Sequence, residues 1–161
     1  MSLGLQVERA ALWEHNHTQG VLVGDLILLS PRVGARKARF TVAHEIGHYI
    51  LGTDSGSQEA ELQADAIAAA LLMPHPHVAP WMHARMGRRP EALTPAGWAM
   101  RERKDKIITA LVRECDVSYA TCLQTLADMG LVRGVEPWGC PGEAYSAYHL
   151  ALRRMGRDAS D

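Results

Sequence analysis

The stretch TVAHEIGHYIL, residues 41–51, contains the pattern H-E-x-x-H. In an α-helix, residues four apart lie about 40° apart around the axis and about 6 Å apart along it, so His44 and His48 can turn both imidazoles toward one metal ion. Glu45 lies beside that face, where its carboxylate can take a proton from a water bound to the metal. Two histidines on a helix can also be surface residues, so the hydrolase interpretation needs a helix and a third ligand.

The surroundings of this stretch favour a helix. Residues 35–51 contain no proline, and the sequence GTD at residues 52–54 is typical of a C-terminal stop. Gly47 lies inside the expected helix, where glycine costs about 1 kcal/mol relative to alanine. Its presence predicts either a close approach of another backbone or a lack of space beside the metal.

A second helix is expected to begin after Ser57 as its N-cap and to end before Pro74. Glu61 and Asp65 lie four apart on one face of this helix. The spacing lets Glu61 bind the metal while Asp65 accepts a hydrogen bond from a ligand histidine and fixes its tautomer. An alanine-rich face would let the two helices approach closely, and it comprises Ala64, Ala66, Ala68, Ala69 and Ala70.

The sequence leaves the third ligand open. Asp54, which follows His48 by six residues, and Asp65 itself are alternatives to Glu61. Asp54 is the weaker alternative, because Leu51 occupies the position at which the long metzincin motif needs glycine. The acidic residues of the second helix could also form a solvated edge near a helix N-terminus.

Two motifs, RFTVAHEIGH at residues 39–48 and ExxADxIAAxLLMP at residues 61–74, together resemble the ImmA/IrrE family of metallo-endopeptidases. The resemblance covers about residues 20 to 74, and two ordered motifs at the family's spacing are far more specific than H-E-x-x-H alone. One departure is Ile67, where the family usually has phenylalanine. This difference changes packing rather than chemistry.

The resemblance implies a zincin-type fold of gluzincin character, with His44, His48 and Glu61 as zinc ligands and Glu45 as the catalytic acid/base. Zinc is the expected cofactor, and the sequence leaves manganese open as an alternative. Members of the family are typically cytoplasmic proteins of bacteria or phages that cleave helix-turn-helix repressors or antitoxins. They thereby switch on stress or mobile-element genes, so a regulatory protein of this kind is the expected substrate.

Composition agrees with one globular domain and a small extension. The chain has 161 residues, 47% of them apolar, and its formal net charge of −1 gives no electrostatic argument for a nucleic-acid or membrane binder. Its 3 cysteines include no C-x-x-C pair, which disfavours a disulfide scaffold and makes a reduced, intracellular compartment the default. No apolar run is long enough to span a membrane, and the N-terminus lacks the pattern of a secretory signal.

Residues 20–30, GVLVGDLILLS, have a β-rich pattern. Two short apolar runs flank Gly24 and Asp25, which predicts a hairpin. In zincins an edge strand beside the H-E-x-x-H helix commonly pairs with extended substrate, and the run at residues 26–29 is the candidate for that strand. The alternative is a strand that is simply buried.

Three further side chains are weaker candidates for contacts with substrate. Arg39 precedes His44 by five residues and could instead pair with an acidic residue of the second helix. His75 and His77 lie in a segment rich in proline and histidine, residues 75–83, which we expect to be a loop. Either histidine could stabilise the oxyanion that develops on the scissile carbonyl, although a plain surface position is the simpler interpretation.

Residues 107–132 have the outline of a helix-turn-helix, with a Ser or Asp cap in the turn and a glycine at the end. The second helix begins with YATCLQT, residues 119–125, and this segment has no Lys or Arg with which to hold phosphate or guanine. Members of the ImmA/IrrE family often carry a similar segment after the catalytic helices. We therefore interpret it as structural or substrate-docking, and direct nucleic-acid binding is not expected.

These elements predict an α+β fold: a small zincin-like sheet, an H-E-x-x-H helix and a second ligand helix, followed by a helical, helix-turn-helix-like bundle. Residues 1–132 are assigned to the metallopeptidase domain, which includes the helix-turn-helix-like helices at about 105–132, and residues 133–161 to a tail with a short helix. Two other functions stay as alternatives. One is a catalytically silent module that docks a repressor, and the other is a DNA-binding regulator with a structural metal site.

Overall fold

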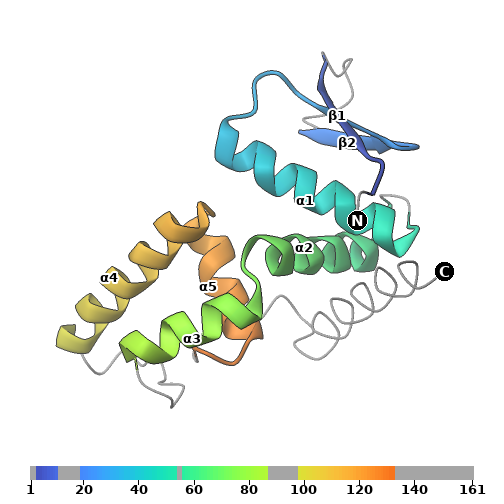
Figure 1. Ribbon diagram of the computed structural model, residues 1–161. Helices are drawn as coiled ribbons and strands as arrows, with labels where there is room; N and C mark the ends of the chain where they lie inside the picture. The colour runs from blue at the N-terminus through green and yellow to red at the C-terminus, as the bar shows by residue number, and fades with distance from the viewer. Residues whose placement is uncertain (1–2, 11–18, 54–55, 87–97, 133–161) are drawn as a thin grey trace. The chain divides into compact units, whose positions relative to one another are not determined.

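The computed structural model describes residues 3–10, 19–53, 56–86 and 98–132. Within them, a small mixed sheet and five helices form the α+β fold that the sequence predicts (Figure 1). The described residues up to Ala68 form one compact unit, called the first unit below, and those from Ala69 onward form the second unit. The expected tail, residues 133–161, lies outside the described residues.

The sheet of the first unit has β3 (Leu26–Leu29) between β1 (Gln6–Arg9) and β2 (Gly20–Val23). β2 and β3 form the predicted antiparallel hairpin, and Gly24 at its turn has a φ of 59°, which glycine adopts without strain. β1 pairs with β3 in parallel. The expectation that residues 26–29 form an edge strand is therefore wrong, because β3 has a neighbour on each side and β2 is an edge of the described sheet.

Helix α1 (Ala35–Leu51) has the predicted bounds and lies along one face of the sheet (Figure 1). A Cβ atom added at Gly20 of β2 would lie only 2.4 Å from Cγ2 of Thr41 in α1. The helix also covers a small apolar core made of Ile27, Leu29 and Ala38. The helix that carries H-E-x-x-H is therefore fixed closely against β2.

Helix α2 (Gln58–Leu72) begins at the predicted cap, since the Ser57 hydroxyl accepts a hydrogen bond from the backbone N–H of Ala60 at 3.1 Å. It packs on α1 at Gly47. A Cβ atom added there would lie 2.9 Å from both Cα and the carbonyl oxygen of Ala64. The two helices meet backbone to backbone, which confirms the close approach predicted from Gly47.

The second unit consists of helices around an apolar core. Its elements are α3 (His75–Met86), α4 (Trp98–Cys115) and α5 (Tyr119–Asp128). The fully or almost fully buried side chains of this core include Met73, Val78, Met82, Ile108, Leu111, Cys122 and Leu126. The α4–α5 pair confirms the two helices predicted for this region, and Ser118 caps α5 by accepting the backbone N–H of Thr121 at 3.0 Å.

The expectation of a loop over residues 75–83 is wrong, because α3 contains the whole of this segment. Pro76 lies in the first turn of α3, where a backbone N–H has no helical partner to lose. Pro80 lies inside the helix and removes one hydrogen bond. Burial of Val78 and Met82 in the apolar core compensates for that loss.

No helix in the described part of the chain combines the length and the apolarity needed to cross a membrane.

Candidate metal centre

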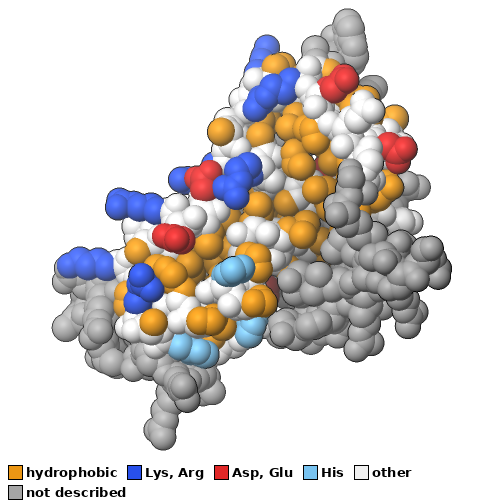
Figure 2. All heavy atoms as spheres, viewed as in Figure 1, with side chains coloured by type: hydrophobic (Ala, Val, Ile, Leu, Met, Phe, Trp, Pro, Cys, Tyr) orange, Lys and Arg blue, Asp and Glu red, His pale blue; other side chains and the backbone are white. Residues whose placement is uncertain are grey.

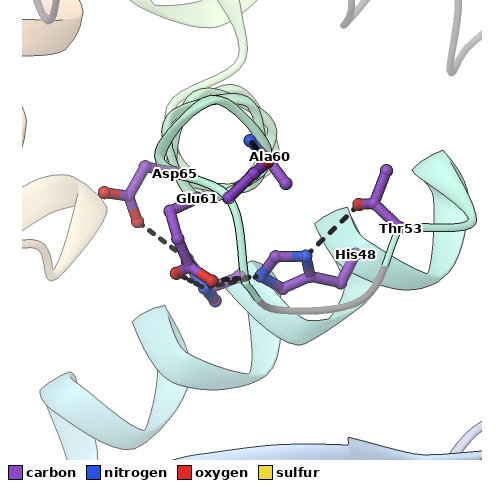
Figure 3. A network of polar contacts seen from close by, with 7 residues as sticks. His48, Thr53, Ala60, Glu61 and Asp65 are labelled. Carbon is purple, nitrogen blue, oxygen red and sulfur yellow. Dashed lines mark hydrogen bonds and ion pairs between the residues drawn. The ribbon is translucent and has the colours of Figure 1, made fainter.

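Helices α1 and α2 bring two imidazoles and one carboxylate to a common point (Figure 3). Nε2 of His44 lies 3.1 Å from Nε2 of His48, one helical turn further along α1. The Glu61 carboxylate, from the first turn of α2, has one oxygen 3.2 Å from the His44 nitrogen and the other 3.4 Å from the His48 nitrogen. All of these side chains belong to the first unit.

The spacing of these donor atoms suits a zinc ion. Ligands that lie about 2.0 to 2.1 Å from zinc at tetrahedral angles are about 3.3 Å from one another. The observed separations of 3.1, 3.2 and 3.4 Å bracket this value. Imidazole nitrogen and carboxylate oxygen are also donors that zinc and manganese both accept. The three side chains therefore fit a divalent metal ion.

Asp65 contacts His44 from the side opposite the cluster. Its Oδ1 lies 2.7 Å from Nδ1 of His44, which leaves Nε2 directed at the cluster. Burial lowers the pKa of His44, but the hydrogen bond and charge of Asp65, helped by Glu45 and Glu61, outweigh it, so that the pKa is raised above its ordinary value. The geometry makes Asp65 a partner of a candidate ligand rather than a third ligand.

Thr53 contacts the other histidine, and the sequence reasoning did not identify this contact. Its Oγ1 lies 3.4 Å from Nδ1 of His48 (Figure 3). His48 is only 2% exposed, so few other partners can reach this nitrogen. The available signal was the position of Thr53 directly after Gly52, because a glycine that ends a helix turns the next residue back over the last turn.

Glu45 is buried next to the two histidines and to β2. Burial raises the pKa of its carboxyl above the ordinary value, against the lowering effects of His44, His48 and a hydrogen bond from the backbone N–H of Leu22. The carboxylate is thus a stronger base than an ordinary glutamate and lies where little bulk water competes with it. These are properties that a general base needs.

The other candidates from the sequence are either undescribed or belong to other parts of the chain. Asp54, the alternative third ligand, lies outside the described residues. Arg39 is exposed on α1, while His75 and His77 lie on α3 in the second unit. Contacts of Arg39, His75 or His77 with substrate stay predictions.

Comparison with known families agrees with this geometry. The model of peptidase family M78, described as the IrrE N-terminal-like domain, matches residues 4–88, more than half of the chain. The chain belongs to this family. The match contains every residue of the cluster, so the IrrE N-terminal-like domain is the part of the protein that carries the candidate metal centre. No curated protein matches the chain.

Membership in the IrrE N-terminal-like family confirms the resemblance seen in the sequence and identifies a metallopeptidase-like domain. The family match also extends to β1, which the sequence reasoning passed over. The second helical pair, α4 and α5, lies beyond the matched residues.

Proposed function

We propose that the protein is a zinc-dependent endopeptidase. The observation that carries the proposal is the convergence of His44, His48 and Glu61, with the buried carboxyl of Glu45 beside them. Structural zinc sites are usually closed by four protein ligands, whereas catalytic sites have three and keep one position for water. The described residues supply three ligands, and the Glu61 side chain is 44% exposed, so this cluster has an open side.

The chain's own residues divide the work of hydrolysis. Zinc would supply a Lewis acid that lowers the pKa of water and polarises the scissile carbonyl. Glu45 accepts a proton from the attacking water and then donates it to the leaving amine. Asp65 keeps the proton of His44 on Nδ1, so that Nε2 retains its lone pair. The backbone N–H of Leu22 holds the Glu45 carboxylate in place.

The β2 edge of the sheet offers a site for an extended peptide. The N–H of Ser30 donates to the carbonyl of Gln19, so these two residues are a hydrogen-bonded pair. Hydrogen-bonded and non-hydrogen-bonded pairs alternate along an antiparallel hairpin, so the pairs of Gly20 and of Leu22 are not hydrogen-bonded. The backbone groups of Gly20 and Leu22 therefore point away from β3. The Leu22 N–H already donates to Glu45, so a paired peptide would use the Gly20 groups and the Leu22 carbonyl. A peptide strand added to β2 would pass directly beside the proposed base.

We further propose that the substrate is a cytoplasmic helix-turn-helix repressor or an antitoxin, as the ImmA/IrrE resemblance implies. Pairing through the backbone would give affinity with little dependence on sequence, so recognition of one regulator needs additional contacts. The α4–α5 pair is a candidate for such docking. Figure 2 shows described Lys and Arg side chains beside acidic and hydrophobic ones. The start of α5, residues 119–125, has no Lys or Arg, which supports a protein partner over nucleic acid.

The test is cleavage of the repressor whose gene lies nearest to the gene of this protein, with zinc and with manganese in parallel. Glu45→Gln keeps the shape of the side chain and removes the base, so we expect the cleavage rate to fall by about 10² to 10⁴-fold while bound metal is unchanged. His48→Ala is the matched control and should lose both metal and cleavage.

Equal cleavage rates for wild type and Glu45→Gln would contradict the role of Glu45. Metal binding without cleavage of any repressor tested would favour the silent docking module. Binding to duplex DNA that weakens steeply with salt would favour the DNA-binding regulator.

A further inference from the structure

The last turn of α1 ends in a way that bears on His48. Gly52 has a φ of 63°, and its backbone N–H donates to the carbonyl of Tyr49 at 3.3 Å. The next N–H, that of Thr53, donates to the carbonyl of His48, also at 3.3 Å. These two bonds form a Schellman motif, in which the chain folds back over the helix end. The residue that folds back is therefore tied to the backbone of a metal-ligand candidate.

The side chain of Thr53 contacts the same histidine. Its Oγ1 lies 3.4 Å from Nδ1 of His48, while Nε2 of that ring faces His44 and Glu61 (Figure 3). If Nε2 binds a metal, Nδ1 carries the proton and needs an acceptor, because the ring is buried. The Thr53 hydroxyl can be that acceptor.

We propose that Thr53 is a positioning residue of the metal centre, whose hydroxyl accepts a hydrogen bond from Nδ1 of His48 and holds the ring with Nε2 toward the metal. The inference rests on the proposed metal site and goes beyond it, since it assigns a role to the segment that connects the two ligand helices. The two histidines then have unlike supports: a carboxylate on α2 for His44 and a hydroxyl on the α1–α2 connection for His48.

The left-handed conformation of Gly52 is part of this arrangement. A residue with a side chain is strained at a φ of 63°, and relaxing that strain would unfold the motif that returns Thr53 to His48. The position of the hydroxyl thus depends on the backbone geometry at Gly52.

The experiment compares zinc affinity, by competition with a chromophoric chelator, in the full-length wild type and in Thr53→Val and Thr53→Ser. Valine keeps the branched shape and removes the hydroxyl, whereas serine keeps the hydroxyl. We expect Thr53→Val to bind zinc about tenfold more weakly and Thr53→Ser to bind like wild type. Loss of a residue that hydrogen-bonds a metal ligand typically weakens metal binding by about 10- to 100-fold, and a tenfold loss is at the lower end of that range. Thr109→Val, at a half-buried position on α4, is the matched control and should change nothing.

Two more readouts separate positioning from folding. The visible absorption bands of the cobalt-substituted protein should shift in Thr53→Val and not in Thr53→Ser, and the melting temperature of the metal-free chain should be the same in both variants. Unchanged zinc affinity in Thr53→Val, or an equal loss in Thr53→Ser, would overturn the inference while wild type still binds zinc. If wild type binds no zinc, the metal-site proposal itself fails.

Discussion

The two units of the chain are stabilised in contrasting ways. The first unit buries titratable groups, Glu45 and His48, and joins its helices through the smallest residues, Gly47 and Ala64. The second unit buries apolar side chains, and its buried titratable group, the Cys122 thiol, has its pKa raised to about 12 by burial and stays uncharged. Burial of titratable groups therefore lowers the stability of the first unit, whereas burial of apolar side chains raises the stability of the second.

Because of this contrast, a metal ion can stabilise the first unit directly but not the core of the second. In the first unit, His44, His48 and Glu61 bring three metal-binding atoms together. A cation that binds them in the folded chain would add to folding stability. The core of the second unit needs no such partner. Substitutions in the two units should therefore differ in how they affect metal affinity.

The largest change in stability is expected for Leu126→Ala in α5, where the side chain is fully buried. Loss of its packing should lower the free energy of unfolding by about 2 to 5 kcal/mol. Urea titration of the zinc-free chain measures this loss, and zinc affinity should stay at the wild-type value well below the unfolding midpoint. Weaker zinc binding in this variant would break the contrast, because it would show that the second core supports the metal centre.

A smaller change is expected for Gly47→Ala. The added methyl group would meet the backbone of Ala64, so we expect a loss of about 1 to 3 kcal/mol from overpacking, offset in part by the better helix propensity of alanine. Unlike Leu126→Ala, this variant should also bind zinc more weakly, because spreading α1 and α2 separates Glu61 from the histidines. Gly56→Ala, where a Cβ meets no atom within 4 Å, is the control for both measurements.

The smallest effect is the dependence of stability on pH. The raised pKa of His44 contributes stability that is present below the unfolded pKa and is lost as pH rises through the folded pKa. The raised pKa of Glu45 acts in the same direction, because burial in the folded state disfavours the charged carboxylate. We therefore expect the metal-free chain to melt at lower temperature as pH is raised from about 6 to 8.

Zinc should reverse this trend, because it competes with the proton for His44 and binds more tightly at higher pH. Melting scans with chelator and with zinc compare the two cases directly. Asp65→Asn, which removes the main group that raises the pKa of His44, should flatten the metal-free dependence. A metal-free melting temperature that rises over the same pH range would show that other groups control the first unit.

Local signals were enough to predict α1, α2 and the hairpin. The bounds of α1 follow from the absence of proline and from Gly52, and the start of α2 follows from Ser57. The convergence of Glu61 with the histidines was also foreseeable, because helical spacing and the family resemblance both indicate it. These features depend on residues that are close in sequence.

The features that sequence reasoning missed depend on contacts between distant segments. β1 (Gln6–Arg9) is exposed at every position and exists through its pairing with β3, which also makes β3 central instead of an edge. The prolines of α3 favour a loop in the sequence, and the helix forms because side chains such as Met82 are buried in the apolar core. The contact of Thr53 with His48 needs the left-handed turn at Gly52, which sequence alone does not specify.

The contact between α1 and α2 also limits how this protein can evolve. A side chain at position 47 would collide with Cα and the carbonyl oxygen of Ala64, both of them backbone atoms. Trimming residue 64 to glycine would leave those atoms in place, so no compensating substitution there can make room. We therefore expect glycine to persist at position 47 in descendants of this sequence that keep the metal centre, whatever residue drifts into position 64.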